Sequence, residues 1–187
     1  VIQFASTRKN IPFISIKITG LVSSSLLEKL NTTLSSKSTE PLSNRFNNRL
    51  AQLSQEEQAQ WEQLITRTKR LCQAASDAGI GLMIDAEESW IQDAIDAVET
   101  KMMASFNLGK VVVYNTIQLY RSDRLSYVTE TLEAAEKGRY IAGLKLVRGA
   151  YMEKERARAE EFGYPSPIQP NKESTDKDYD AAVKVCM

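Results

Sequence analysis

Apolar and polar positions along the chain predict strands and helices that alternate with one another. Strands are predicted where short, mostly apolar runs end in polar residues, at 11–21, 81–85, 110–116 and 142–150. Amphipathic helices are predicted at 55–78, 89–106, 123–138 and 152–163. Ser54 is a candidate cap for the first of these helices, and Gly79 is its stop signal. The last three strands are centred about 30 residues apart, which is the length of one βα unit.

This alternation predicts an α/β fold with a parallel sheet, either doubly wound or closed as a barrel. The serine-rich segment 22–53 is weakly helical, and we expect it to form a loop and helical insertion between the first two strands. The length of 187 residues is enough for one domain with a core. Because the chain stops at Met187 inside an apparent helix, without a Gly or Pro stop signal, we expect a segment of a longer protein.

Charge and residue content narrow the classes of function. The 24 basic and 24 acidic residues cancel, so no nucleic-acid partner is expected. The absence of histidine excludes His-based triads, H-E-x-x-H zinc sites and imidazole acid–base chemistry within the chain. Cys72 and Cys186 lie too far apart for a metal or redox motif, which favours a reducing compartment. The charged run at 153–161 alternates in sign and predicts a solvated helix face.

Polar residues end all four predicted strands, where parallel α/β folds bind their ligands. They are Lys17, Asp85, the stretch 115–118, and Lys145 with Arg148. Each has an ordinary structural explanation when taken alone, because a strand-end Asp often caps a helix and a Lys extends into water. Four strands that all end in this way favour a binding site.

The last strand predicts a specific contact. Lys145, Val147 and Gly149 share one face of the strand by the period of two, and Arg148 lies on the other. A lysine inside a barrel needs an anion beside it, because an unpaired buried charge is costly. Asp85 lies at a similar height, so we predict a direct or water-bridged contact between Lys145 and Asp85. Gly149 would let a ligand approach the backbone closely.

Several segments resemble the proline dehydrogenase family, the flavin enzymes that start proline catabolism. They are IDAEESW (84–90), VYNTIQLYRSDRL (113–125), KLVRGAYMEKERARAEEFGYPSPIQP (145–170) and STDKDYDAAV (174–183). The strand at 11–21 resembles the first barrel strand of the family with its lysine. The resemblance implies a distorted (β/α)8 TIM-like barrel that binds FAD noncovalently. Residues 1–187 would be a partial barrel of about the first four βα units.

The same resemblance assigns roles to individual residues. Asp85 and Lys145 match catalytic positions, and Lys145 stands where many members have an arginine near flavin N5. Substrate-binding positions match Lys17 and Tyr151. Flavin-contacting positions match Ala86, Gln118, Arg148, Gly149 and Ala150. Many bacterial members have arginine and lysine where this chain has Lys145 and Arg148, and these two cations are not equivalent donors.

The resemblance implies oxidation of L-proline to 1-pyrroline-5-carboxylate, with a hydride passing to flavin N5 and the electrons passing to a quinone. Two alternatives stay open: oxidation of 4-hydroxyproline on the same fold, and a non-catalytic truncated barrel. No metal is implied, and peripheral membrane association is left open. The protein would be cytoplasmic or membrane-peripheral in a bacterium and mitochondrial in a eukaryote. We expect residues 1–187 alone to be inactive, because the Thr-His motif and paired arginines of the later strands are missing.

Overall fold

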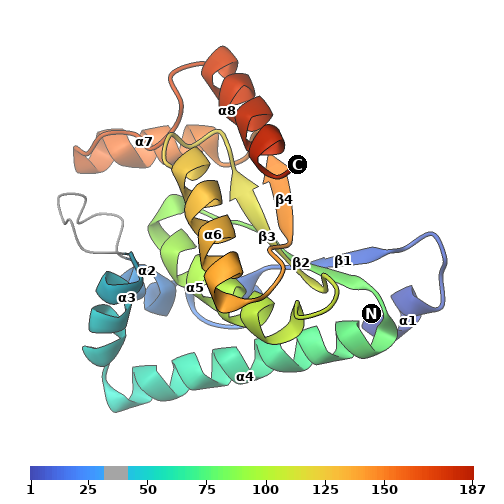
Figure 1. Ribbon diagram of the computed structural model, residues 1–187. Helices are drawn as coiled ribbons and strands as arrows, with labels where there is room; N and C mark the ends of the chain where they lie inside the picture. Colours follow the sequence, from blue (N-terminus) through green and yellow to red (C-terminus); the bar gives the residue numbers. More distant parts are fainter. Residues whose placement is uncertain (32–41) are drawn as a thin grey trace.

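Four parallel strands form the centre of the computed structural model, which describes residues 1–31 and 42–187 (Figure 1). The strands are β1 (Phe13–Ile16), β2 (Gly81–Ile84), β3 (Val113–Gln118) and β4 (Leu144–Val147). They are hydrogen-bonded in the order β1-β2-β3-β4, and every pairing is parallel. This sequential order is that of a (β/α)8 barrel, whereas a doubly wound sheet reverses its order at a switch point. The sheet is therefore an arc of a barrel, as the family resemblance implies.

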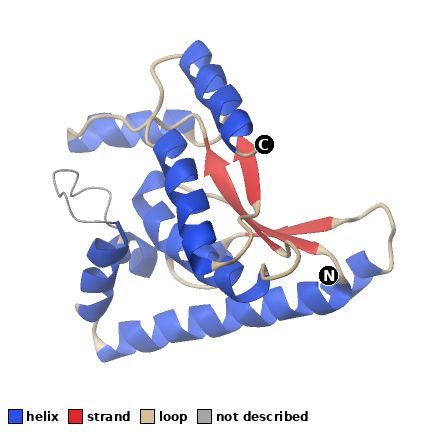
Figure 2. Ribbon diagram, viewed as in Figure 1, coloured by secondary structure: helices blue, strands red, loops and turns tan. Residues whose placement is uncertain are grey.

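Helices connect the strands and pack along one face of the sheet (Figure 2). The crossovers between successive strands contain α4 (Gln55–Ala78), α5 (Ser89–Phe106) and α6 (Arg124–Gly138). The first crossover also contains α2 (Ser24–Leu30) and α3 (Leu42–Ala51). The remaining helices are α1 (Ile2–Ser6) before β1, and α7 (Met152–Phe162) and α8 (Lys172–Val185) after β4. Helices α2 and α3 lie within the predicted insertion at 22–53, whose residues 32–41 are outside the described residues.

The bounds of α4 follow the signals in its sequence. The Ser54 side chain accepts a hydrogen bond from the backbone N–H of Glu57, whose carboxylate accepts one from the Ser54 N–H at 2.8 Å. This reciprocal pair satisfies two of the N–H groups that a helix start leaves free. Gly79 ends the helix in the left-handed conformation, with φ of 67°. The predicted start and stop of this helix are both confirmed.

The two faces of the sheet differ in character. Leu82, Ile84 and Val113 point toward the helices and are fully buried in the main hydrophobic core. On the opposite face, the rings of Phe13 and Tyr114 meet edge to face, with their centroids 5.4 Å apart. A Cβ at the intervening Gly81 would lie 2.4 Å from the Phe13 ring, so the glycine makes room for the aromatic pair. The amino-terminal end of this face is therefore filled by side chains.

Strand bounds differ from those predicted. Strand β1 ends at Ile16, and the buried Ile18 lies in a 3-10 turn, so the strand predicted at 11–21 is too long. Strand β3 starts at residue 113 instead of 110, because the Asn107 side chain accepts hydrogen bonds from the N–H groups of Val112 and Val113. Strand β4 is likewise shorter than the predicted 142–150. Apolar residues thus continue past the points where strand pairing stops.

Candidate functional site

Four polar residues form one row across the sheet, which passes the carboxyl ends of β1 and β2 and crosses β3 and β4 within the strands. Thr116 of β3 pairs in register with Lys145 of β4. Asp85 and Lys17 each follow the last residue of their strand, and those last residues are paired with each other. The row therefore runs Lys17, Asp85, Thr116, Lys145 in the order of the strands. Lys17 and Asp85 lie at strand ends, as the rule for parallel strands predicts. Lys145 is the second residue of β4 and reaches the row because β3 and β4 extend past the end of β2.

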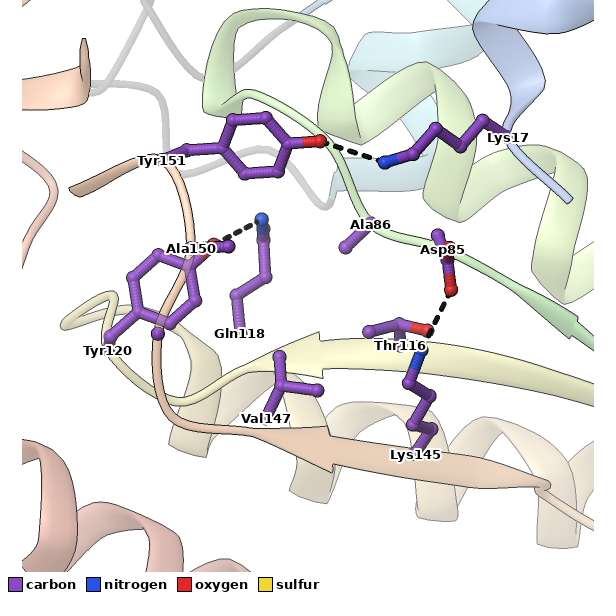
Figure 3. A pocket seen from close by; sticks show the side chains of 11 residues that line it. Lys17, Asp85, Ala86, Thr116, Gln118, Tyr120, Lys145, Val147, Ala150 and Tyr151 are labelled. Carbon is purple, nitrogen blue, oxygen red and sulfur yellow. Dashed lines mark hydrogen bonds and ion pairs between the residues drawn. The ribbon is translucent and has the colours of Figure 1, made fainter. Parts of the chain in front are cut away.

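Lys145 and Asp85 form an ion pair across this row. The Lys145 Nζ donates to Asp85 Oδ1 at 2.7 Å, so the predicted contact is confirmed (Figure 3). The side chains are 32% and 25% exposed, so the pair is only partly open to water. Thr116, which lies between them in the register, donates its hydroxyl to the Ile84 carbonyl oxygen at 2.7 Å. An ammonium group has three donors, so Lys145 keeps donors for a ligand.

Lys17 and Tyr151 form a second contact at the pocket, where the Lys17 Nζ donates to the Tyr151 hydroxyl at 2.9 Å (Figure 3). This hydrogen bond is the main reason that the pKa of Lys17 is raised, and the carboxylates of Glu87 and Asp85 raise it further. Lys17 is therefore a cation at neutral pH. Tyr151 has a φ of 55°, a left-handed conformation that is costly for a bulky residue. Such a conformation marks the segment before α7 as a candidate functional element.

Gly149 lies in the same segment and has no packing role that explains it. A Cβ there would meet only the Met152 sulfur, at 3.8 Å, which is ordinary contact. The Gly149 backbone is also outside the left-handed region that favours glycine. Gly149 therefore leaves open space against the backbone, and a ligand can approach closely there. Ala150, which follows it, also lines the pocket.

Gln118 and Tyr120 line the pocket at the end of β3. The Gln118 Nε2 donates to the Glu87 carbonyl oxygen at 2.6 Å and to the Tyr120 hydroxyl at 2.9 Å. Sequence reasoning did not identify Tyr120 as a site residue. Thr116, Gln118 and Tyr120 share the period of two, but Tyr120 lies in a turn beyond β3, where this period does not fix a face.

Helix α7 is held by a buried carboxylate. Glu155 is 1% exposed and accepts hydrogen bonds from the Ser89 backbone N–H and hydroxyl, both at 2.6 Å. Lys154 and Arg158 lie against the Trp90 ring. The solvated face predicted at 153–161 is therefore wrong at Glu155. The start of α5 leaves N–H groups unpaired, and these attract a carboxylate from the neighbouring helix.

Arg148 is the one predicted site residue whose side chain lies away from the pocket. Its NH1 atom contacts Asp176 Oδ1 of α8 at 3.1 Å, and its guanidinium lies over the Tyr179 ring. This position agrees with the strand face on which the sequence places it. A role of Arg148 in flavin binding stays a prediction.

The other eight predicted site residues gather around one pocket of about 220 Å³ (Figure 3). It is lined by Lys17, Asp85, Ala86, Thr116, Gln118, Tyr120, Lys145, Val147, Gly149, Ala150 and Tyr151. Two ammonium groups, one carboxylate, an accessible glycine backbone and two tyrosines suit a flat ligand with acceptor atoms, and the FAD implied by the resemblance is such a ligand. No group of three metal-ligating side chains is found among residues 1–31 and 46–187, whose side chains the structure describes.

Comparisons with known proteins point to one family. The family model described as proline dehydrogenase matches residues 3–187. The chain is 39% identical to human mitochondrial proline dehydrogenase 1 over 75% of the chain and 22% of that protein. It is 30% identical to the hydroxyproline dehydrogenase of Xenopus laevis over 90% of the chain and 38% of that protein. The fold resembles proline utilization A from Bdellovibrio bacteriovorus, with a TM-score of 0.70 and 22% identity over 91% of this chain and 15% of that one. The chain spans about a fifth of the length of the animal proline dehydrogenases that it matches.

Proposed function

Because the chain belongs to the proline dehydrogenase family, we propose that its pocket serves the FAD-dependent oxidation of L-proline to 1-pyrroline-5-carboxylate. FAD, when bound, supplies the hydride acceptor at N5 and passes the electrons on to a quinone. The observation that carries this proposal is the Lys145–Asp85 pair, fixed at 2.7 Å beside the open backbone of Gly149 in one pocket.

Lys145 and Asp85 are proposed as the catalytic pair. Asp85 holds the Lys145 ammonium in place, so the cation is oriented before any ligand arrives. A preorganised cation stabilises negative charge that develops on the flavin ring, and it needs no reorganisation during the reaction. A lysine in this position is a point charge, and it keeps two N–H donors free for the ligand.

Lys17 and Tyr151 are proposed to bind the substrate. A carboxylate is a stronger acceptor for an ammonium than a phenol oxygen, so the proline carboxylate replaces Tyr151 as the main partner of Lys17. Among the lining side chains, the two ammonium groups of Lys17 and Lys145 outnumber the one carboxylate of Asp85, so a further cation in the pocket is disfavoured. This excess of positive charge is proposed to favour the neutral amine of proline, which is the form that can lose a hydride from the adjacent carbon.

The flavin side of the pocket is proposed to consist of Ala86, Gln118, Gly149 and Ala150. Ala86, Gly149 and Ala150 have small or absent side chains, so the flat ring can lie close to their backbone. Arg148 would take part through its backbone, because its side chain contacts Asp176 outside the pocket.

The test is reduction of the bound flavin by proline without oxygen, in the protein as its gene encodes it. We expect L-proline to bleach the visible flavin absorbance of the wild type. Lys145→Met should slow this reduction by about 10²–10³-fold, the usual effect of removing one group that stabilises developing charge. Lys137→Met is the matched control, because that side chain is 79% exposed and outside the pocket. A wild type that proline does not bleach, or an equal rate for Lys145→Met, would overturn the proposal.

Hydroxyproline oxidation is the second candidate, and the match to the Xenopus protein over 90% of the chain favours it. We expect a larger kcat/KM for L-proline than for trans-4-hydroxy-L-proline. A larger kcat/KM for trans-4-hydroxy-L-proline would instead support hydroxyproline oxidation as the function. Turnover of neither substrate would favour the non-catalytic alternative.

A location in mitochondria is proposed if the protein is eukaryotic, because the human and Drosophila relatives are named mitochondrial proteins. In a bacterium we propose a cytoplasmic or membrane-peripheral location. Within the described ranges, no helix has the length and apolar character needed to cross a bilayer.

A further inference from the structure

The side-chain amide of Gln118 has an orientation that two partners define. Its Nε2 lies 2.6 Å from the Glu87 carbonyl oxygen, which can only accept a hydrogen bond. Its Oε1 faces the guanidinium of Arg121, which can only donate, at 3.5 Å. Arg121 is fully buried and is itself held by two hydrogen bonds to the Asp123 carboxylate, at 3.0 and 2.7 Å. The Gln118 NH₂ group therefore points toward Glu87 and away from Arg121.

The second N–H of this amide defines the direction of the bond to Tyr120. The Gln118 Nε2 lies 2.9 Å from the Tyr120 oxygen, and an amide nitrogen only donates. The Tyr120 oxygen therefore accepts, and its own proton points elsewhere. Burial raises the pKa of Tyr120, so the hydroxyl keeps this proton at neutral pH. In the part of the chain that the structure describes, the hydrogen bonds include no acceptor for it.

The position of Tyr120 shows where an acceptor could lie. Tyr120 is 1% exposed and yet forms part of the pocket wall, next to Ala150 (Figure 3). A buried hydroxyl without an acceptor is costly, and a ligand in the pocket would remove that cost. We propose that Tyr120 donates a hydrogen bond to the pocket ligand, and that Gln118 is a positioning residue that directs the Tyr120 proton into the pocket.

This inference rests on the proposed function, because it takes the ligand to be FAD, whose ring carries carbonyl oxygens and ring nitrogens as acceptors. It assigns a different role to Gln118 from the one that the family resemblance implies. Both N–H groups of Gln118 are used within the protein, so the donor offered to the ring is the hydroxyl of Tyr120. The order of donation runs from Arg121 through Gln118 to Tyr120, and such chains strengthen their last donor.

The experiment measures the Kd of FAD by quenching of flavin fluorescence, in the protein as its gene encodes it. Tyr120→Phe should raise the Kd about five- to tenfold, the effect of losing one buried hydrogen bond. Tyr140→Phe is the matched control, because the Tyr140 hydroxyl is also buried without a partner but does not line the pocket. The control should keep the wild-type Kd within about twofold, the scale of a substitution away from the site.

A double variant separates the two roles. If Gln118 acts through Tyr120, Gln118→Leu should weaken FAD binding by about the same factor, and the combined variant should bind no more weakly than either one. Losses that multiply would mean that Gln118 contacts FAD itself, which overturns the positioning role.

If the wild type binds FAD and the Kd of Tyr120→Phe for FAD is within twofold of the wild-type value, the inference is overturned and the proposed function still stands. A wild type without affinity for FAD refutes both. If Tyr120→Phe does not fold, Gln118→Leu decides alone, and an unchanged Kd in that variant overturns the inference.

Discussion

Replacing Glu155 tests how α7 is held against the rest of the barrel. Its carboxylate receives two hydrogen bonds of 2.6 Å from Ser89, at the start of α5. The Glu155 N–H also donates to the Tyr151 carbonyl oxygen at 2.8 Å, so this first turn of α7 continues directly from the pocket segment. We therefore expect Glu155→Ala to loosen both α7 and the wall formed by Gly149 and Tyr151.

The magnitude follows from these contacts. A hydrogen bond to a charged group contributes about 1.5–3 kcal/mol. A carboxylate at a helix start contributes about 0.3–1 kcal/mol more. The whole arrangement would thus be worth about 3–7 kcal/mol. Water entering the gap would supply new partners for Ser89, so we expect the lower part of that range, about 3–4 kcal/mol. Glu155→Gln keeps an acceptor for the Ser89 N–H and should cost about 1–2 kcal/mol.

The assay is urea denaturation followed by circular dichroism, with free energies taken from the midpoint and the slope. Glu153→Ala is the control, because Glu153 lies on the same turn and is exposed. It should change the free energy of unfolding by less than about 0.5 kcal/mol. If Glu155→Ala and Glu153→Ala have the same midpoint, the two bonds to Ser89 contribute nothing measurable and the reasoning is refuted.

Three further predictions concern other parts of the chain. Lys17→Ala should weaken proline binding by roughly 1.5–3 kcal/mol, because a hydrogen bond to a charged group is lost. The FAD content of the protein should stay the same. Loss of flavin with an unchanged KM for proline would contradict this assignment of Lys17. Burial and the neighbouring Asp96 raise the pKa of Glu99 well above its usual 4.5, so the folded state keeps a proton that the unfolded state releases. The free energy of unfolding of the wild type should therefore fall as the pH rises above 4.5. Measured by urea denaturation, Glu99→Gln should exceed the wild type in free energy of unfolding by a margin that grows by up to about 1.4 kcal/mol per pH unit. A margin that does not change with pH would contradict this prediction. Residues 1–187 expressed alone should aggregate and bind no FAD, because β1 and β4 each leave an edge unpaired in the described sheet. A yellow, monomeric product with a cooperative thermal transition would show that this prediction is wrong.

Helix bounds could be predicted where the signal is local. Ser54, Glu57 and Gly79 lie within or next to the helix that they start and end, so their types are enough to place α4. Strand bounds depend on pairing partners that are distant in sequence. The side chain of Asn107 takes the N–H groups that would have extended β3, and no apolar pattern reports such a contact.

The site was predictable to the extent that it depends on strand order. Parallel strands end at one edge, so the proximity of Lys17 and Asp85 followed once the strands were identified. Lys145 meets Asp85 from near the start of β4, because β3 and β4 extend past the end of β2, and no sequence pattern reports that register. Glu155 was not predictable, because its partner Ser89 is 66 residues away and the charged run around it is typical of a solvated helix. Tyr120 lies just beyond β3, where the alternation of faces is no longer a safe guide.

The sequential strand order also bears on how the chain folds. The pairing of Thr116 with Lys145 closes a loop of 29 residues, and that of Leu82 with Val113 closes one of 31. The pairing of Phe13 with Gly81 closes 68 residues, a little over twice as many. Each doubling of loop length adds about 0.6 kcal/mol of closure entropy. On this ground we expect β2, β3 and β4 to associate first and β1 to join them last, so that Lys17 completes the row after Asp85, Thr116 and Lys145 are in place.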